Sequence, residues 1–109
     1  MRLEAVKRPR VKVDIWEIAD YIARDSLDAA ERFVVAVDES IEFLRDFPAS
    51  GQPISSRKRK LAGLRLWQVK GFPNHMICFR ADEGRIEVFA VFQGNRLLSK
   101  VLRELAEEL

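Results

Sequence analysis

The feature that most constrains the fold is a series of three apolar segments between Leu61 and Phe92. The first two are joined by Gly71-Phe72-Pro73-Asn74 and the last two by Asp82-Glu83-Gly84. Gly, Pro, Asn and Asp between apolar and β-branched runs are typical of hairpin turns. Because two-residue to four-residue connections of this kind join antiparallel strands, the pattern predicts an antiparallel meander of three strands.

The last of these segments, Ile86 to Phe92, is nearly continuous in apolar and β-branched residues. Such a run is typical of a strand that is buried on both faces, so we expect it to be the central strand. A shorter segment, Arg2 to Lys7, alternates apolar and polar residues and ends before Pro9, which lacks the N–H that a ladder needs. This segment predicts a first strand at or near one edge of the sheet.

Two amphipathic helices are predicted between the first strand and the meander. The apolar stripe of the first helix consists of Val11, Ile15, Ile18 and Ile22. The second helix begins after Ser26, a favourable N-cap, and ends before Pro48 and Gly51. Its stripe consists of Ala30, Phe33, Val37, Ile41 and Leu44. Because the joint at Asp25-Ser26 is short, the helices should form an antiparallel αα-hairpin.

A third amphipathic helix is predicted at the end of the chain. Its apolar stripe consists of Leu98, Val101, Leu102, Leu105 and Leu109. All these elements together predict a two-layer α+β fold in a single domain, residues 1–109, with the helical hairpin packed on the sheet.

The side chains of the first meander strand alternate between two faces. If Leu64 and Leu66 face the hairpin, then Arg65, Trp67 and Val69 lie on the opposite, open face. An open apolar face is unfavourable in water. The apolar stripe of the third helix could be buried on this face or on a partner, and we expect the helix to fold back on the face that carries Trp67 because that site is closer in the sequence.

Composition excludes several classes of protein. Cys78 is the only cysteine and His75 the only histidine, so neither an internal disulfide nor a four-ligand zinc site is possible within the chain. No apolar run is long enough to cross a bilayer, and the first residues do not resemble a signal peptide. We expect a cytoplasmic protein without cofactor, metal or membrane contact. The net charge of +2 favours no class of partner.

Four local patterns occur in an order that is specific to one family. They are Asp14-Ile15 with Glu17-Ile18 and Tyr21-Ile22-Ala23; Asp25-Ser26 with Ala29-Ala30 and Arg32-Phe33; Leu44 with Pro48 and Gly51; and Gly63-Leu64-Arg65 with Val69, Gly71-Phe72-Pro73 and Arg80. With the order strand, helix, helix, three strands, they resemble the ParE branch of the RelE/ParE toxins. The sequence departs from that family at Ala90, at Gln93-Gly94-Asn95-Arg96 and in its additional C-terminal helix.

The resemblance implies the toxin of a type II toxin–antitoxin module. Such a toxin would be neutralised by a cognate antitoxin and would inhibit DNA gyrase by binding, with nucleic acid contacted only indirectly. We expect the antitoxin to cover the groove of the helical hairpin and an exposed edge or face of the sheet. Two alternatives stay open: a ribosome-dependent messenger-RNA endonuclease of the RelE type, and a relative that binds an antitoxin without being toxic.

Eight residues are candidate contacts with the target or the antitoxin. They are Arg57, Lys58, Arg59 and Lys60 in a basic loop, Arg65, Arg80 and Arg96 at strand positions, and Trp67. The three strand arginines could provide positive charge near one sheet face. No catalytic residue is assigned, because Tyr21 lies on the first helix and His75 is expected to be a solvated or capping residue in a turn. The pattern therefore favours a binding protein over an enzyme.

Overall fold

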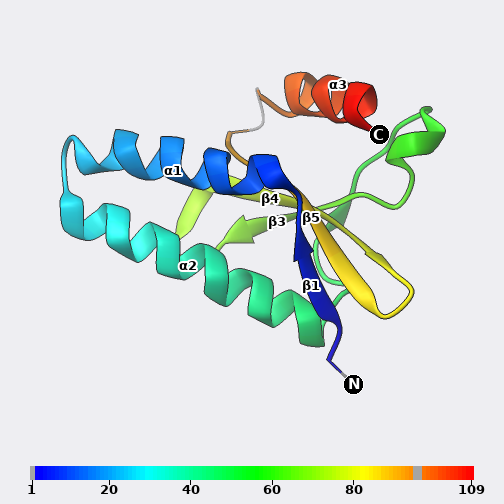
Figure 1. Ribbon diagram of the computed structural model, residues 1–109, viewed down its shortest axis with the longest axis horizontal. Coiled ribbons are helices and arrows are strands. Elements are labelled where there is room, and N and C mark those ends of the chain that lie inside the picture. Colours follow the sequence, from blue (N-terminus) through cyan, green and yellow to red (C-terminus); the bar gives the residue numbers. More distant parts are fainter. Residues whose placement is uncertain (1, 95–96) are drawn as a thin grey trace.

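The computed structural model describes residues 2–94 and 97–109 (Figure 1). The elements are β1 (Glu4–Lys7), α1 (Pro9–Ala23), α2 (Leu27–Asp46), β2 (Gln52–Pro53), the 3-10 helix η1 (Arg59–Leu61), β3 (Arg65–Val69), β4 (Phe72–Asp82), β5 (Arg85–Gln93) and α3 (Leu98–Glu108). The strands form one sheet in the order β1-β5-β4-β3-β2. The predicted α+β fold, with an N-terminal strand, a helical hairpin, an antiparallel meander and a C-terminal helix, is confirmed.

The strand β5 lies inside the sheet, next to the middle strand β4 and not in the central position that was expected, and it pairs in parallel with β1 and antiparallel with β4. Ile86 and the residues from Val88 to Phe92 are buried, which confirms the expectation of a strand covered on both faces. The partner β1 reaches only as far as Val88. Beyond that point, the Asp14 carboxylate of α1 accepts a hydrogen bond from the Val91 N–H at 3.0 Å. A helix side chain thus satisfies a backbone donor that β1 is too short to pair.

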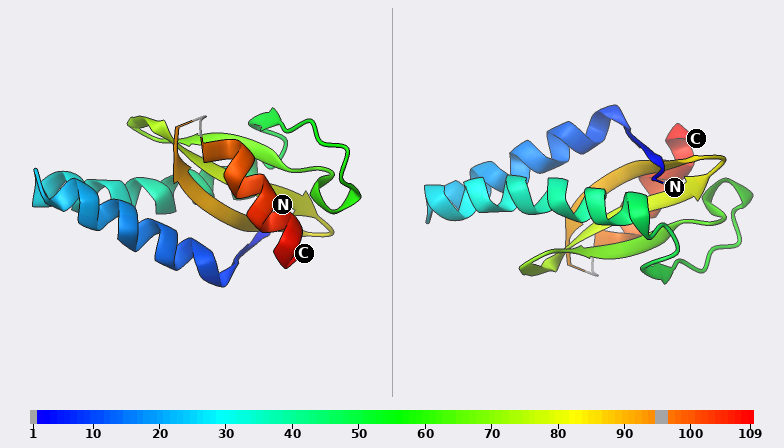
Figure 2. Two further views of the ribbon diagram at one scale, coloured as in Figure 1. Left: turned by 90° about the horizontal axis from the view of Figure 1, so that it is seen from above. Right: turned by 90° about the horizontal axis from the view of Figure 1, so that it is seen from below.

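The helices α1 and α2 form an antiparallel hairpin that covers one face of the sheet (Figures 1 and 2). The Ser26 hydroxyl caps α2 by accepting a hydrogen bond from the Ala29 N–H at 3.0 Å. All five residues of the predicted α2 stripe are buried: Ala30, Phe33, Val37, Ile41 and Leu44. The last four of these residues form one core cluster with Val69, Ile77, Phe79 and Val91 of the sheet.

The helix α3 packs on the opposite face of the sheet (Figure 2). Its buried side chains are those of Val101, Leu105 and Ala106. They join a second core cluster with Leu61, Leu64, Leu66, Cys78, Phe89, Ala90 and Phe92. The prediction that α3 folds back on its own sheet is confirmed, and the helix adds a partial third layer to the two that were expected.

The prediction of which sheet face α3 covers was wrong. Trp67 and Val69 pack in the cluster under the hairpin, whereas Leu64 and Leu66 pack under α3. Strand alternation correctly grouped these side chains but left open which layer covers each group. That choice depends on the helices, which lie far away in the sequence. In the described part of the chain, none of the helices combines the length and apolar character needed to cross a bilayer.

Candidate functional site

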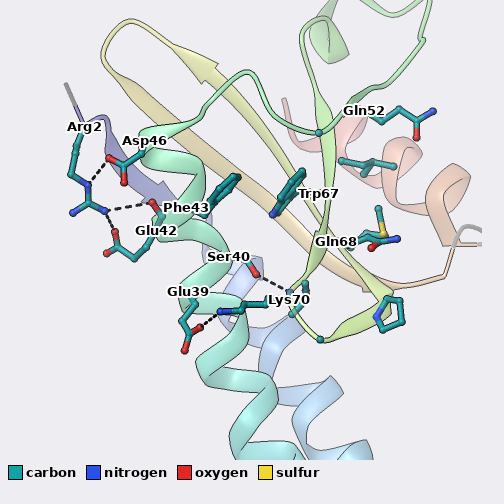
Figure 3. A pocket seen from close by; sticks show the side chains of 16 residues that line it. Arg2, Glu39, Ser40, Glu42, Phe43, Asp46, Gln52, Trp67, Gln68 and Lys70 are labelled. Atoms are coloured by element: carbon teal, nitrogen blue, oxygen red, sulfur yellow. Dashed lines mark hydrogen bonds and ion pairs between the residues drawn. The ribbon is translucent and has the colours of Figure 1, made fainter.

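A groove of about 890 Å³ lies between α2 and the edge of the sheet formed by β3 (Figure 3). The helix α2 lines it with Glu39, Ser40, Glu42, Phe43 and Asp46. The other wall comes from the region of β2 and β3 and from the turn into β4. Arg2, which precedes β1, lies at one end. The groove is therefore built from segments that are far apart in the sequence.

Aromatic rings form one wall of the groove. The rings of Phe43 and Trp67 stack with centroids 5.3 Å apart and planes inclined by 7°. Phe47 extends the stack, with its ring 4.8 Å from that of Phe43. Phe43 is 41% exposed and Phe47 57% exposed. Exposed aromatic side chains are enriched at protein-binding surfaces.

The edge of β3 is only partly paired. The two-residue strand β2 lies opposite Arg65 and Leu66, and among residues 2–94 and 97–109 no strand lies beside the residues from Trp67 to Val69 on that side. Just beyond them, the Lys70 N–H donates to the Ser40 hydroxyl of α2 at 3.0 Å. This bond ties the end of β3 to the helix and leaves a short open edge inside the groove.

The charged groups at the rim are paired. Arg2 bonds with Glu42 and, at 3.0 Å, with Asp46, and Arg45 bonds with Glu42 at 2.9 Å. Partial burial acts to raise the pKa of Glu42, but hydrogen bonds from Arg2 and Arg45 outweigh this and lower it. These pairs are exposed and contribute little to stability. Because they neutralise the rim, the groove suits a partner with apolar side chains.

The structure separates the arginines that were expected on one face. Arg65 of β3 lies opposite Phe79 of β4, so Arg80, the next residue, points to the other face. The Arg65 guanidinium donates to the Gly51 carbonyl at 3.2 Å. The prediction of a common positive face was wrong, because strand register places the two side chains on opposite sides.

Arg80 holds the loop before β3 in place. Its guanidinium donates to the carbonyls of Lys60 and Ala62 at 3.0 and 3.1 Å and lies 5.0 Å above the Phe89 ring. Two carbonyl oxygens and an aromatic face thus surround the Arg80 guanidinium. Arg96 lies outside the described residues.

The basic loop lies away from the groove. None of Arg57, Lys58, Arg59 and Lys60 lines it, and all four are exposed. The Lys60 ammonium donates to the Ala106 carbonyl of α3 at 3.2 Å. Lys60 therefore helps to join the loop to α3, and the other three side chains point into solvent.

His75 is a core residue, so the expectation of a solvated or capping histidine was wrong. It lies on β4, with its ring 5.0 Å from that of Phe33 and 6.1 Å from that of Phe72. Burial lowers its pKa, and its Nδ1 has no hydrogen-bond partner among the described residues. The strand begins at Phe72, earlier than the turn pattern indicated, and directs His75 toward α2.

The remaining reactive side chains lie apart from one another. Tyr21 is 61% exposed on α1. Cys78 is buried under α3, and burial raises its pKa to about 12, so the thiol stays protonated. Among residues 2–94 and 97–109, no group of three or more His, Cys, Asp or Glu side chains is arranged to hold a metal ion.

Sequence reasoning placed Trp67 among the candidate contacts but missed Phe43, Phe47 and Arg2. One signal was available. Phe43 lies directly beside the α2 stripe residue Leu44, so a large apolar side chain stands just outside the buried face of the helix.

The fold and the groove define a small α+β protein with a surface suited to a protein partner. Residues 6–98 match the model of the family described as the ParE toxin of type II toxin–antitoxin system, parDE. The chain therefore belongs to the ParE toxin family, as its hairpin patterns indicated. The comparison with curated proteins found no match.

A solved structure of the chromosomal ParDE TA system from P. aeruginosa contains a chain of similar fold, with a TM-score of 0.68. The two chains are 16% identical, and the match covers 86% of this chain and 98% of that one. At this identity the similarity shows the shared fold.

Proposed function

We propose that the protein is a toxin that a cognate antitoxin neutralises and that it inhibits DNA gyrase by binding, without covalent chemistry. The observation that carries the proposal is the family match over residues 6–98. Both activities would take place in the cytoplasm, and nucleic acid would be contacted only through gyrase.

The arrangement of polar side chains supports binding rather than RNA cleavage. General acid–base catalysis needs a proton donor or acceptor within hydrogen-bond reach of the reacting group. His75 is buried toward α2, and Arg80 on the other face is engaged by two carbonyls. An aromatic groove with a neutralised rim offers a contact surface instead. The exposed Arg57, Lys58 and Arg59 stay candidate contacts for an acidic surface of gyrase or the antitoxin.

The test is a supercoiling assay with purified gyrase and relaxed plasmid. We expect the toxin to inhibit supercoiling at concentrations comparable to that of gyrase, and the product of the adjoining gene to restore it. Relaxation of the same plasmid by topoisomerase I is the control and should not change. Cleavage of messenger RNA on programmed ribosomes, with gyrase unaffected, would instead identify an endonuclease.

A further inference from the structure

We propose that the protein binds gyrase through the outer hairpin surface, formed around Trp16 and Val34 on the side of α1 and α2 away from the sheet. This surface docks on a positively charged surface of gyrase. The inference rests on the proposed function, which supplies gyrase as the partner. It specifies which part of the toxin makes the contact and which charge the contact requires.

Four exposed apolar side chains of the hairpin lie outside both the core and the groove at β3. They are Val13, Trp16, Leu27 and Val34, with exposed fractions of 52%, 60%, 67% and 41%. Apolar side chains scattered singly over a surface are ordinary, whereas a contiguous group of them marks an interaction site. Their arrangement on the two helices therefore decides what they can do.

The bonds made by the two helices place these side chains beside the joint between α1 and α2. Asp14 of α1 bonds to β5, and Trp16, two residues later, lies on the opposite side of that helix. Asp38 of α2 bonds to Lys7, which leads into α1, and Val34 lies one turn earlier on the same side. Trp16 and Val34 therefore come from the neighbouring sides of the two helices.

The hairpin is negatively charged although the chain as a whole is basic. Ten of the 17 acidic residues lie between Pro9 and Asp46, together with only five of the 19 basic ones. Asp20 lies about one turn after Trp16, and Glu31 about one turn before Val34. Within residues 2–94 and 97–109, neither of these two carboxylates forms an ion pair. Such a surface attracts a partner of positive potential.

Basic side chains near the joint contact aromatic rings of the same helix. The Lys12 ammonium lies 5.1 Å from the centroid of the Trp16 ring, and the Arg24 guanidinium lies 5.5 Å from that of Tyr21. A cation over an aromatic face is held there by the charge distribution of the ring. The contact with Lys12 restrains the indole, and a side chain that is already restrained loses less entropy on binding.

Gyrase suits the outer hairpin surface because of the charge that its own substrate requires. An enzyme that holds DNA presents positive charge to the phosphates, so gyrase has surfaces of the required sign. The groove at β3 lies elsewhere: Phe43, which lines it, follows Val34 by about two and a half turns and is therefore on the opposite side of α2. A partner segment in the groove leaves the outer hairpin surface uncovered.

The position of the hairpin also suits contact with a large enzyme. The connection between α1 and α2 projects beyond the sheet at one end of the molecule, whereas the loop before β3 lies toward the opposite end (Figure 1). The helix α3 covers the other face of the sheet. A large partner can therefore approach the outer hairpin surface without meeting α3 or the basic loop.

The first test compares two exposed aromatic residues of α1 in the supercoiling assay. Trp16→Ala removes the largest side chain of the outer hairpin surface and should raise the toxin concentration for half-inhibition at least about tenfold. Tyr21→Ala is the matched control, because Tyr21 is 61% exposed but lies on the side of α1 next to α3. It should change that concentration less than about threefold. Circular dichroism should show that both variants are folded.

The second test separates local charge from total charge in direct binding to purified gyrase. Asp20→Lys combined with Glu31→Lys should weaken binding at least about tenfold at about 0.1 M salt. Glu107→Lys combined with Glu108→Lys makes the same change in net charge at exposed positions of α3 and should weaken it less than about threefold. The difference between the two variants should shrink as the salt concentration rises.

Three results would overturn the inference while leaving the proposed function intact. The first is full inhibition of gyrase by Trp16→Ala. The second is an equal effect of the two charge reversals, which would mean that total charge and not this surface controls binding. The third is a Trp16→Ala variant that inhibits gyrase but no longer binds the product of the adjoining gene, which would assign the surface to the antitoxin. If the unsubstituted toxin does not inhibit gyrase, the proposed function fails and this inference fails with it.

Discussion

The two edges of the sheet differ in how their backbone groups are satisfied. At the β1 edge, Arg45 of α2 bonds both backbone groups of Leu3: its carbonyl accepts from the Leu3 N–H at 3.1 Å and its Nε donates to the Leu3 carbonyl at 2.7 Å. Asp14 of α1 satisfies Val91 where β1 ends. At the β3 edge, β2 pairs only with Arg65 and Leu66 and does not extend beside Gln68, near the aromatic rings of Phe43 and Trp67. The helices thus supply bonding partners for Leu3 and Val91 beside the short strand β1, whereas β2 pairs only part of the outer edge of β3.

The comparison shows that pairing an edge and covering a face are separate tasks. The hairpin and α3 cover both faces of the sheet, including the face beneath β3. Part of the outer edge of β3 nevertheless has no strand beside it in the described chain, and the Ser40 hydroxyl of α2 accepts a hydrogen bond from the Lys70 N–H just beyond that part. An open edge beside a covered face is what β-augmentation requires.

The largest loss of stability is expected from a substitution in the core under α3, and the effects of substitutions at the two edges can be compared with it. Leu105→Ala should lower the free energy of unfolding by about 2–5 kcal/mol, because the fully buried side chain leaves a cavity between α3 and the sheet. Urea unfolding measures this. The exposed Leu97→Ala serves as the control and should have little effect. If Leu105→Ala lowered the free energy of unfolding by less than the substitutions at the sheet edges do, α3 would not contribute to the core.

At the satisfied edge, Asp14→Ala should lower the free energy of unfolding by about 1.5–3 kcal/mol. The substitution removes a charged acceptor from the Val91 N–H and from Arg10, at a site where the carboxylate is mostly buried. Urea unfolding is again the measurement. Arg32→Ala, which breaks an exposed pair with Asp28, should change stability by about 0.5 kcal/mol or less. Equal effects of the two substitutions would contradict the role of Asp14 at this edge.

On the face of the sheet that α2 covers, His75 should make stability depend on pH. Burial lowers its pKa in the folded state below the ordinary 6.5, so the unfolded chain binds the proton more readily. The contribution is fully present above pH 6.5 and is lost as the pH falls below it. His75→Phe should reduce this slope between pH 7 and 5 in urea titrations, relative to the unsubstituted chain. If the free energy of unfolding depended on pH equally in both proteins, carboxylates and not His75 would be the titrating groups.

The smallest effect is expected at the open edge itself. Gln68→Lys should change the free energy of unfolding by less than about 0.5 kcal/mol, because the exposed side chain makes no contact that the fold needs. A lysine on an unpaired edge opposes edge-to-edge association. Light scattering of the isolated toxin should therefore decrease. A large loss of stability would mean that the Gln68 side chain makes a contact that the fold needs.

The local features of the fold could be predicted because they depend on neighbouring residues. The stripe from Ala30 to Leu44, the cap at Ser26 and the strand at Ile86 to Phe92 follow from spacings of 3.6 and 2 residues. Of the candidate contacts, Trp67 does line the groove. Phe43 and Arg2 could not be assigned to it, since the groove exists only once α2 lies beside β3.

The sequence by itself determined the elements, their order and the family to which the chain belongs, because periodicity, caps and turn residues act over a few neighbouring positions. Only the tertiary structure decided that Trp67 faces α2, that Arg65 and Arg80 lie on opposite faces, and that β2 pairs with only two residues of β3. Each of these depends on strand register and on which distant helix covers a face. Such contacts join residues that are far apart in the chain, so no local pattern specifies them.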